Sequence, residues 1–326
     1  MCGISGIVAD GDQQKNIEAM CRMLVHRGPE NTSIYRYENV WLGHNRLRII
    51  DIETGDQPIF NEDGSVGVVF NGEIYNFMEI KADLEEKGHT FKTTSDTEIL
   101  VHLYEEKGIE MFDKLNGIFA FAILDKNRNR IILARDHFGV KPLFYYERGG
   151  KLVFGSEAKA ILTHPDVPRK RNDHATHLLA NLRYVQSEQT LFKDIHHVPP
   201  GSYLVHENGK SKVSRYYEFN PEVQDISFED AKDGIQARLK EAVRRQLISD
   251  VPIGVYLSGG IDSSSLVAMM SELGVDDIRT FTLGFNDPTD EFDSAKMIAD
   301  QFSTNHQTLS LDLDPMKHFP NVIWHA

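Results

Sequence analysis

Short apolar runs alternate with turns rich in glycine, asparagine and aspartate from residue 1 to about residue 203. Runs rich in Val, Ile, Phe and Tyr between such turns are typical of β-strands. We predict strands at Ile4–Val8, Val40–Asn45, Val66–Phe70, Phe119–Asp125, Arg130–Arg135, Leu143–Glu147 and Lys151–Gly155. Helical spacing of apolar residues predicts helices at Asn16–Val25, Met78–Lys87 and Thr97–Lys107, the last capped by Ser95. Strand clusters separated by helices predict layered α+β sheets.

The pattern changes after a polar, turn-rich stretch that begins near Tyr203. We expect a first domain over residues 1–205, a linker over 206–226 and a second domain over 227–326. In the second domain a helix ending near 246 precedes strand 253–257, a glycine turn, helix 264–273 and strand 280–285. This order predicts a parallel α/β unit that binds a nucleotide.

Composition narrows the class of protein. The 326 residues include 35 basic and 49 acidic side chains, a formal charge of -14, which argues against nucleic-acid binding through a basic face. Cys2 and Cys21 are too few for a disulfide framework, and no tight Cys/His cluster in the sequence offers four metal ligands. No run has the length or composition of a signal or a membrane span. We therefore expect a cytoplasmic protein without membrane contact.

Cys2 is the first candidate for chemistry. Gly3 follows it, and a small residue there allows Met1 to be removed, which leaves a free α-amine beside the thiol. The thiolate is the reactive form, and an amine with a pKa of about 7.7 to 8.0 can accept the thiol proton. One residue can then serve as nucleophile and base. A cysteine without any role at this position is the alternative, so the neighbouring motifs must decide.

An attack by this thiol on an amide carbonyl needs hydrogen-bond donors for the oxyanion. Asn71 and Gly72 can supply an amide side chain and a backbone N–H where the predicted strand Val66–Phe70 ends in a turn. The alternative for this pair is a hairpin turn without a catalytic role.

A free amino acid as substrate requires a cation and an anion in the same pocket. Arg46 can bind a carboxylate with two hydrogen bonds, although Arg48 could take its place. Asp96 can hold an ammonium group, and its alternative role is that of a helix cap.

A series of short motifs in a fixed order decides among these alternatives. They are Cys2–Gly6, His26–Pro29, Gly43–Leu47, Asn71–Asn76, Ser95–Glu98, Leu115–Gly117 and Arg135–Leu143. Over about residues 2–162 the sequence resembles the N-terminal-nucleophile glutamine amidotransferases. The resemblance implies a four-layer fold, with two facing sheets between helices. It also implies Cys2 as nucleophile, Asn71 and Gly72 as oxyanion hole, Arg46 on the substrate carboxylate, and Glu73 and Asp96 near its amino group.

A second motif, LSGGIDSS, spans Leu257 to Ser264. A glycine-rich turn that leads into a helix points backbone N–H groups and a positive dipole end at one spot, which suits a phosphate. Ser258 and Ser263 add hydroxyl groups, and Asp262 could hold Mg²⁺. The motif lacks the Walker lysine, which disfavours a P-loop NTPase. A glycine turn capped by serines is the structural alternative.

This motif resembles the pyrophosphate-binding loop of the ATP pyrophosphatases, and its position behind an amidotransferase domain resembles the glutamine-dependent asparagine synthetase family. The resemblance implies ATP and Mg²⁺ as cofactors, and glutamine and aspartate as substrates. ATP-binding residues implied by it are Leu257, Ser258, Gly259, Gly260, Asp262, Ser263 and Leu283.

Later motifs of that family have no counterpart in the 326 residues, namely a Ser-Gly-Glu-Gly segment with an acidic pair and a lysine. We therefore expect that this polypeptide alone hydrolyses glutamine but does not make asparagine. A homodimer or a complementing synthetase subunit is the expected partner. Two alternatives stay open, an amidotransferase acting on another carboxylate and a non-catalytic sensor of a nucleotide or an amino acid.

Overall fold

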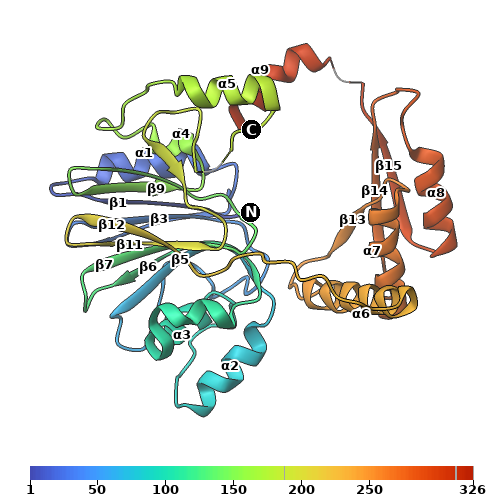
Figure 1. The fold of residues 1–326 in the computed structure, drawn as a ribbon, viewed down its shortest axis with the longest axis horizontal. Coiled ribbons are helices and arrows are strands. Elements are labelled where there is room, and N and C mark those ends of the chain that lie inside the picture. The colour runs from blue at the N-terminus through green and yellow to red at the C-terminus, as the bar shows by residue number, and fades with distance from the viewer. Residues whose placement is uncertain (187, 313, 326) are drawn as a thin grey trace. The chain divides into compact units, whose positions relative to one another are not determined.

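The computed structural model describes residues 1–186, 188–312 and 314–325, and the chain forms two compact units (Figure 1). The first unit runs from Met1 to Glu222 and the second starts at Val223. No helix in the described part of the chain is long and apolar enough to cross a membrane.

Two six-stranded antiparallel sheets form the centre of the first unit. In spatial order, the first sheet consists of β10 (Ile195–His197), β8 (Phe144–Arg148), β9 (Lys151–Gly155), β1 (Gly3–Val8), β3 (Val40–Arg46) and β2 (Asn31–Tyr37). The second consists of β12 (Lys210–Arg215), β11 (Ser202–Glu207), β7 (Arg130–Arg135), β6 (Gly117–Asp125), β5 (Val66–Ile74) and β4 (Ile59–Phe60). Alternation along a strand separates two cores, since Ile4 faces the second sheet while Ile7 faces helices on the outside.

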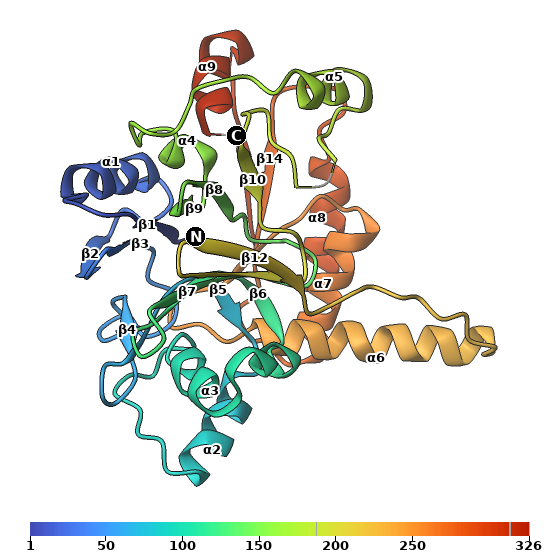
Figure 2. The ribbon, with the colours of Figure 1, turned by 60° about the vertical axis from the view of Figure 1, so that its left-hand side comes forward.

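Helices cover the outer faces of both sheets (Figure 2). The first sheet packs against α1 (Gln14–Leu24) and α4 (Ala158–Ile161), whereas the second is covered by α3 (Ile99–Lys107), with α2 (Phe77–Glu86) against α3. A 3-10 helix, η1 (Gly108–Lys114), follows α3, and α5 (Asp173–Leu182) lies in the connection to β10. The expected four-layer fold is confirmed.

The expected boundary at residue 205 is wrong. It falls inside β11, which pairs with β7 over its whole length and continues into β12 through a turn at Asn208-Gly209. Both turn residues have positive φ, as a tight hairpin requires. The polar residues of β12 suggested a linker because β12 is an edge strand with one solvated face.

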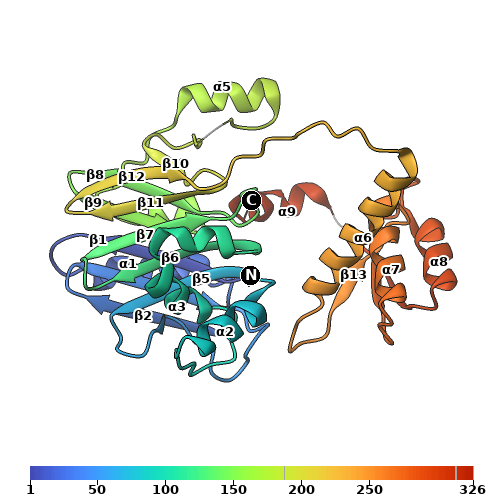
Figure 3. The same ribbon diagram turned by 60° about the horizontal axis from the view of Figure 1, so that its bottom comes forward.

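The second unit contains a parallel sheet in the order β13 (Gly254–Tyr256), β14 (Arg279–Gly284) and β15 (Asn305–Ser310). Its helices are α6 (Phe228–Gln246), α7 (Ile261–Glu272), α8 (Phe292–Gln301) and α9 (Pro315–His325). Ser227 caps α6 by accepting a hydrogen bond from the Asp230 N–H, and α6 packs on α7 (Figure 3). The sequence predicted the strands near 254 and 280 but not β15, whose residues are mostly polar and exposed.

Candidate active site

One cavity in the first unit is lined by all six residues that the sequence proposed for glutamine chemistry. Cys2 precedes β1, Arg46 ends β3, Asn71 to Glu73 belong to β5, and Asp96 lies just before α3. The full lining is Met1, Cys2, Arg46, Leu47, Ile49, Ile50, Gly55, Gln57, Phe70, Asn71, Gly72, Glu73, Ser95, Asp96, Thr97 and Lys141. Segments far apart in the sequence thus meet at one end of the two sheets.

The Cys2 thiol lies beside the backbone of Leu47. The Leu47 N–H donates to Sγ at 3.4 Å, and Sγ lies 3.6 Å from the Leu47 carbonyl oxygen. Arg27 fixes the neighbouring backbone by donating from Nε to the Cys2 carbonyl at 3.0 Å. Burial raises the pKa of the Cys2 thiol, against the Leu47 N–H, the N-terminal amine and Arg46, which favour the thiolate. The thiol therefore requires a base nearby.

The N-terminal amine is one candidate base, and in this structure it belongs to Met1, which lines the same cavity. The amine of Met1 is partly buried, and this burial lowers its pKa below the ordinary value. The charge of the Cys2 thiolate raises the pKa of the amine, and the charge of the amine lowers the pKa of the thiol. The two groups therefore influence each other's titration. An amine with a lowered pKa is more often neutral, which is the form that can accept a proton.

Asn71 and Gly72 lie within a strand rather than in the expected turn. Strand β5 continues to Ile74 because its pairing with β6 runs on from Asn71 opposite Ala120 to Ile74 opposite Gly117. The Asn71 side chain is buried, and its Nδ2 has no hydrogen-bond partner in the described structure. The residues that line the cavity therefore include an amide whose N–H groups bond to no other group of the described protein.

Gly72 is required by close packing of the neighbouring strand. A Cβ atom at this position would lie 2.2 Å from the Ile118 carbonyl oxygen and 2.7 Å from the Phe119 Cα. Any larger residue would separate β5 from β6 at the cavity wall.

Arg46 is held in place by oxygen atoms. Its guanidinium forms an ion pair with Asp56 at 2.5 Å and donates to the carbonyl oxygens of Asp51 and Ile50. Burial alone would raise the pKa of Asp56, but the hydrogen bond from Arg46 keeps this pKa below its ordinary value. Arg48, the alternative in the sequence, contacts Asp56 at 3.6 Å but does not line the cavity. The structure thus places Arg46 and not Arg48 on the cavity wall.

Two carboxylates and a lysine complete the charged lining. Asp96 accepts hydrogen bonds from the Ile74 N–H at 2.9 Å and from the Ser95 hydroxyl at 3.4 Å. Burial raises the pKa of Asp96 to about 7, and the charge of Glu73 adds to this effect. Burial also raises the pKa of Glu73, against the attraction of Lys141. An ammonium group would relieve both carboxylates, since an opposite charge favours their ionised form.

Lys141 was not proposed as a site residue from the sequence. Its loop is fixed by Asp136, whose carboxylate accepts from the backbone N–H groups of Phe119 and Lys141 at 3.1 and 2.9 Å. Arg135 donates to the carbonyl oxygens of Gly139 and Lys141 at 2.7 and 2.8 Å. The motif Arg135–Leu143 is the signal that could have indicated this lysine, because it is the scaffold that places Lys141 in the cavity.

The loop between β13 and α7 is organised by two serines. The hydroxyls of Ser258 and Ser263 lie 3.0 Å apart, and Ser263 also accepts from the Ser258 N–H at 3.2 Å. Gly259 has a φ of +74°, and a Cβ there would lie 2.5 Å from the Ser294 Cβ. The expected helix start at 264 is wrong, because α7 begins at Ile261 and includes Ser263 in its first turn.

A cavity of about 500 Å³ lies at the carboxyl ends of β13 and β14, the edge at which α/β sheets bind ligands. Leu257, Ser258 and Leu283 line it, as the sequence proposed. The other four proposed residues, Gly259, Gly260, Asp262 and Ser263, lie in the adjoining loop and first turn of α7 and do not line this cavity. Asp262 is exposed.

Comparison with known proteins gives matches to both units. The model of a glutamine amidotransferase domain family matches residues 1–217, and that of the asparagine synthase family matches residues 234–326. Asparagine synthetase [glutamine-hydrolyzing] 3 of Bacillus subtilis is 34% identical over 94% of this chain and 53% of its own length. Amidase chry2 of Gibberella zeae is 35% identical over 84% of this chain and 43% of its own. The chain thus spans about half the length of the curated relatives that it matches.

One similar solved structure is that of glutamine phosphoribosylpyrophosphate amidotransferase from B. subtilis, complexed with ADP and GMP. The match covers 94% of this chain and 65% of the chain in that structure. The sequence identity is 19% and the TM-score is 0.49.

Proposed function

Because this chain belongs to the glutamine amidotransferase domain family, we propose that it hydrolyses glutamine to glutamate and ammonia with Cys2 as nucleophile. One observation carries the proposal. A single cavity combines a thiol, an amide donor that bonds to no other group of the described protein, a guanidinium, a buried carboxylate and a half-buried one. These are the groups that a free amino acid with a side-chain amide requires.

In this proposal the substrate is held by charge at its backbone end. The guanidinium of Arg46 faces the α-carboxylate, while Glu73 and Asp96 face the α-ammonium. The ion pair with Asp56 keeps the guanidinium of Arg46 in place before substrate enters. The ammonium has to stabilise the ionised form of Asp96, because its pKa is about 7 without a ligand.

The reaction begins with a proton transfer. Once Met1 is removed, the neutral α-amine of Cys2 takes the thiol proton, and Sγ attacks the amide carbon of glutamine. The carbonyl oxygen becomes an oxyanion, for which the Asn71 Nδ2 and the Gly72 N–H are the proposed donors. The amine returns its proton to the amide nitrogen, and the C–N bond breaks to release ammonia and leave a thioester. Water then adds to the thioester carbon and releases glutamate and the thiol.

For the second unit we propose binding of ATP with Mg²⁺ at the loop after β13. The residues fit a polyphosphate, because two hydroxyls, a glycine with positive φ and the N-terminal end of α7 lie together there. Leu257 and Leu283 would contact the adenine, Ser258 to Ser263 the phosphates, and Asp262 the cation. ATP bound there would supply the adenylyl group that activates a carboxylate for attack by ammonia.

Aspartate is the proposed acceptor, on the strength of the match to the asparagine synthase family. A different acceptor is the alternative, because a relative that is 35% identical to this chain is called an amidase, whereas one that is 34% identical is called an asparagine synthetase. Release of AMP in the presence of aspartate, compared with a panel of other carboxylates, distinguishes the two.

Both cysteines lack a disulfide partner, so we also propose a reducing, cytoplasmic setting.

A glutaminase assay tests the central proposal. Cys2→Ala should abolish ammonia release from glutamine, whereas Cys21→Ala should retain it, since Cys21 is buried in the apolar layer between α1 and the first sheet. Intact mass must show that Met1 is absent from the active protein. Equal ammonia release by wild type and Cys2→Ala would refute Cys2 as the nucleophile.

A further inference from the structure

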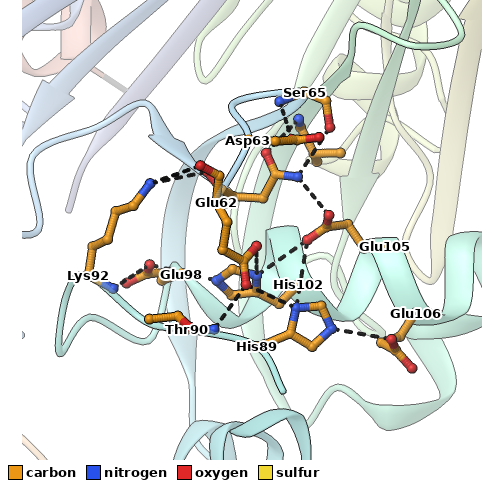
Figure 4. A network of polar contacts seen from close by, with 12 residues as sticks. Glu62, Asp63, Ser65, His89, Thr90, Lys92, Glu98, His102, Glu105 and Glu106 are labelled. Atoms are coloured by element: carbon orange, nitrogen blue, oxygen red, sulfur yellow. Dashed lines mark hydrogen bonds and ion pairs between the residues drawn. The ribbon is translucent and has the colours of Figure 1, made fainter. Parts of the chain in front are cut away.

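Four side chains of types that bind metals converge beside α3, and none of them lines the cavity that contains Cys2 (Figure 4). Glu62 follows β4, His89 lies in the connection after α2, and His102 and Glu105 lie on α3. One ligand atom from each lies within 4.8 Å of the other three. No sequence motif indicates this set, because its members come from three separate segments.

Four contacts between imidazole nitrogens and carboxylate oxygens, which involve both oxygens of Glu62, are close to the spacing in a tetrahedral metal site. The Nδ1 of His102 lies 3.2 Å from the Glu62 Oε2 and 3.3 Å from the Glu105 Oε2. The Nδ1 of His89 lies 3.3 Å from the Glu62 Oε1 and 3.9 Å from the Glu105 Oε2. Zinc bonds of about 2.0 to 2.2 Å in tetrahedral geometry place neighbouring ligand atoms about 3.3 to 3.6 Å apart. The four groups, whose ligand atoms lie within 4.8 Å of one another, would have to close in by about 1 Å at most to enclose an ion.

Both imidazoles point Nδ1 into the cluster and have a carboxylate near their other nitrogen. The Nε2 of His89 lies 3.2 Å from the Glu106 Oε1, and the Nε2 of His102 lies 3.7 Å from the Glu98 Oε1. A carboxylate that accepts a hydrogen bond from the outer nitrogen fixes the tautomer of a ligating histidine, and in the described structure the 3.2 Å contact of His89 has that length whereas the 3.7 Å contact of His102 does not. Glu98 is itself held by the backbone N–H groups of Lys92 and Thr93 at 2.8 and 2.6 Å.

The carboxylates of the cluster are also held from outside. Glu62 accepts from the Thr90 N–H at 2.9 Å, and the second oxygen of Glu105 accepts from the Asn61 side chain at 2.7 Å. With neutral imidazoles the two ligating carboxylates carry two negative charges, which a divalent cation neutralises. His102 is fully buried, so the cluster is closed on one side and open to solvent at Glu62 and Glu105.

We propose that Glu62, His89, His102 and Glu105 bind a zinc-like divalent cation. Two nitrogen and two oxygen ligands favour zinc over Mg²⁺, which prefers six oxygen ligands. The ion would link the connection after α2 to α3 and so fix both ends of the segment between His89 and His102. That segment carries Asp96 into the glutamine cavity, so the ion acts as a structural support for the substrate site.

Isothermal titration of the full chain with ZnCl₂ tests the proposal, in a Cys2→Ala background that removes the competing thiol. One zinc ion per chain is expected, and His89→Gln and Glu105→Gln should each weaken binding more than about tenfold. Neither change alters the fully buried His102, so both variants should fold. Cobalt in place of zinc should give the intense visible absorption of a tetrahedral site, and MgCl₂ should give no binding.

His174→Gln serves as the matched control, since His174 is exposed on α5 and lies outside the cluster. It should bind zinc as tightly as the parent protein. The same cluster would also suit a protonated imidazole, because neighbouring carboxylates raise the pKa of His102 despite its burial. Absence of stoichiometric zinc binding, or equal affinity in parent and His89→Gln, would overturn the metal site and leave a network of ion pairs.

Discussion

Replacement of Asn71 by leucine should separate catalysis from stability. The Asn71 Nδ2 is buried and has no partner in the described structure, so in the folded protein it is an unsatisfied donor. Such a group costs about 1 to 3 kcal/mol, and an apolar side chain of similar size removes this cost. Asn71→Leu should therefore unfold at an equal or higher denaturant concentration than wild type.

The same substitution should cost about 10² to 10³ in kcat, the effect of removing one oxyanion donor and equivalent to about 2.7 to 4 kcal/mol. The KM for glutamine should change little, because the donor acts on charge that develops only in the transition state. Ammonia release under saturating glutamine, together with urea denaturation, gives both quantities on one protein preparation.

Asn76→Ala is the matched control for Asn71→Leu. The Asn76 side chain donates to the Lys114 carbonyl and accepts from the Asn116 N–H, at 2.9 and 3.0 Å, outside the cavity. Its loss should lower stability by about 1 kcal/mol per bond and leave kcat unchanged. If Asn71→Leu were instead less stable with an unchanged kcat, the assignment of Nδ2 as an oxyanion donor would be refuted.

Three further substitutions should change the stability of the protein in a direction that the structure predicts. Gly72→Ala places Cβ 2.2 Å from the Ile118 carbonyl oxygen and should destabilise the first unit by about 1 to 3 kcal/mol in urea denaturation; wild-type stability would contradict the close packing. Burial raises the pKa of Asp96 to about 7, so the folded state gains stability from its proton at acidic pH and loses this gain as the pH rises through 7. Asp96→Asn should thus stabilise the protein more at about pH 8 than at about pH 5, and an equal effect at both would refute the raised pKa. Gly259→Ala, at a φ of +74° and 2.5 Å from the Ser294 Cβ, should lower the unfolding temperature of the second unit without slowing glutamine hydrolysis; a loss of hydrolysis would show that the loop acts on the first unit.

Much of the glutamine cavity could be predicted because its groups follow apolar strands in short, recognisable motifs. Cys2, Arg46 and Asn71 each adjoin or belong to a run whose burial is evident from its composition. The chemistry of a free amino acid then assigns a partner to each group.

Other features depend on contacts that no local pattern contains. Lys141 reaches the cavity only because Asp136 and Arg135 fold its loop. Asn71 and Gly72 resembled a turn because Asn-Gly favours one, but pairing with β6 overrides that local preference. Polar edge strands such as β12 and β15 carry too few apolar residues to be recognised. The His89 and His102 cluster exists only after three segments have come together.

The proposed nucleophile and the proposed oxyanion donor belong to opposite sheets. Cys2 precedes β1 of the first sheet, whereas Asn71 belongs to β5 of the second, and between the sheets lie apolar side chains that include Leu42 and Val69. The gap that the reacting atoms must match is therefore set by the thickness of a hydrocarbon layer. A larger or smaller side chain in that layer would change the distance between the two sheets, and with it the distance between Cys2 and Asn71. Such a substitution would lower turnover without any contact with the substrate.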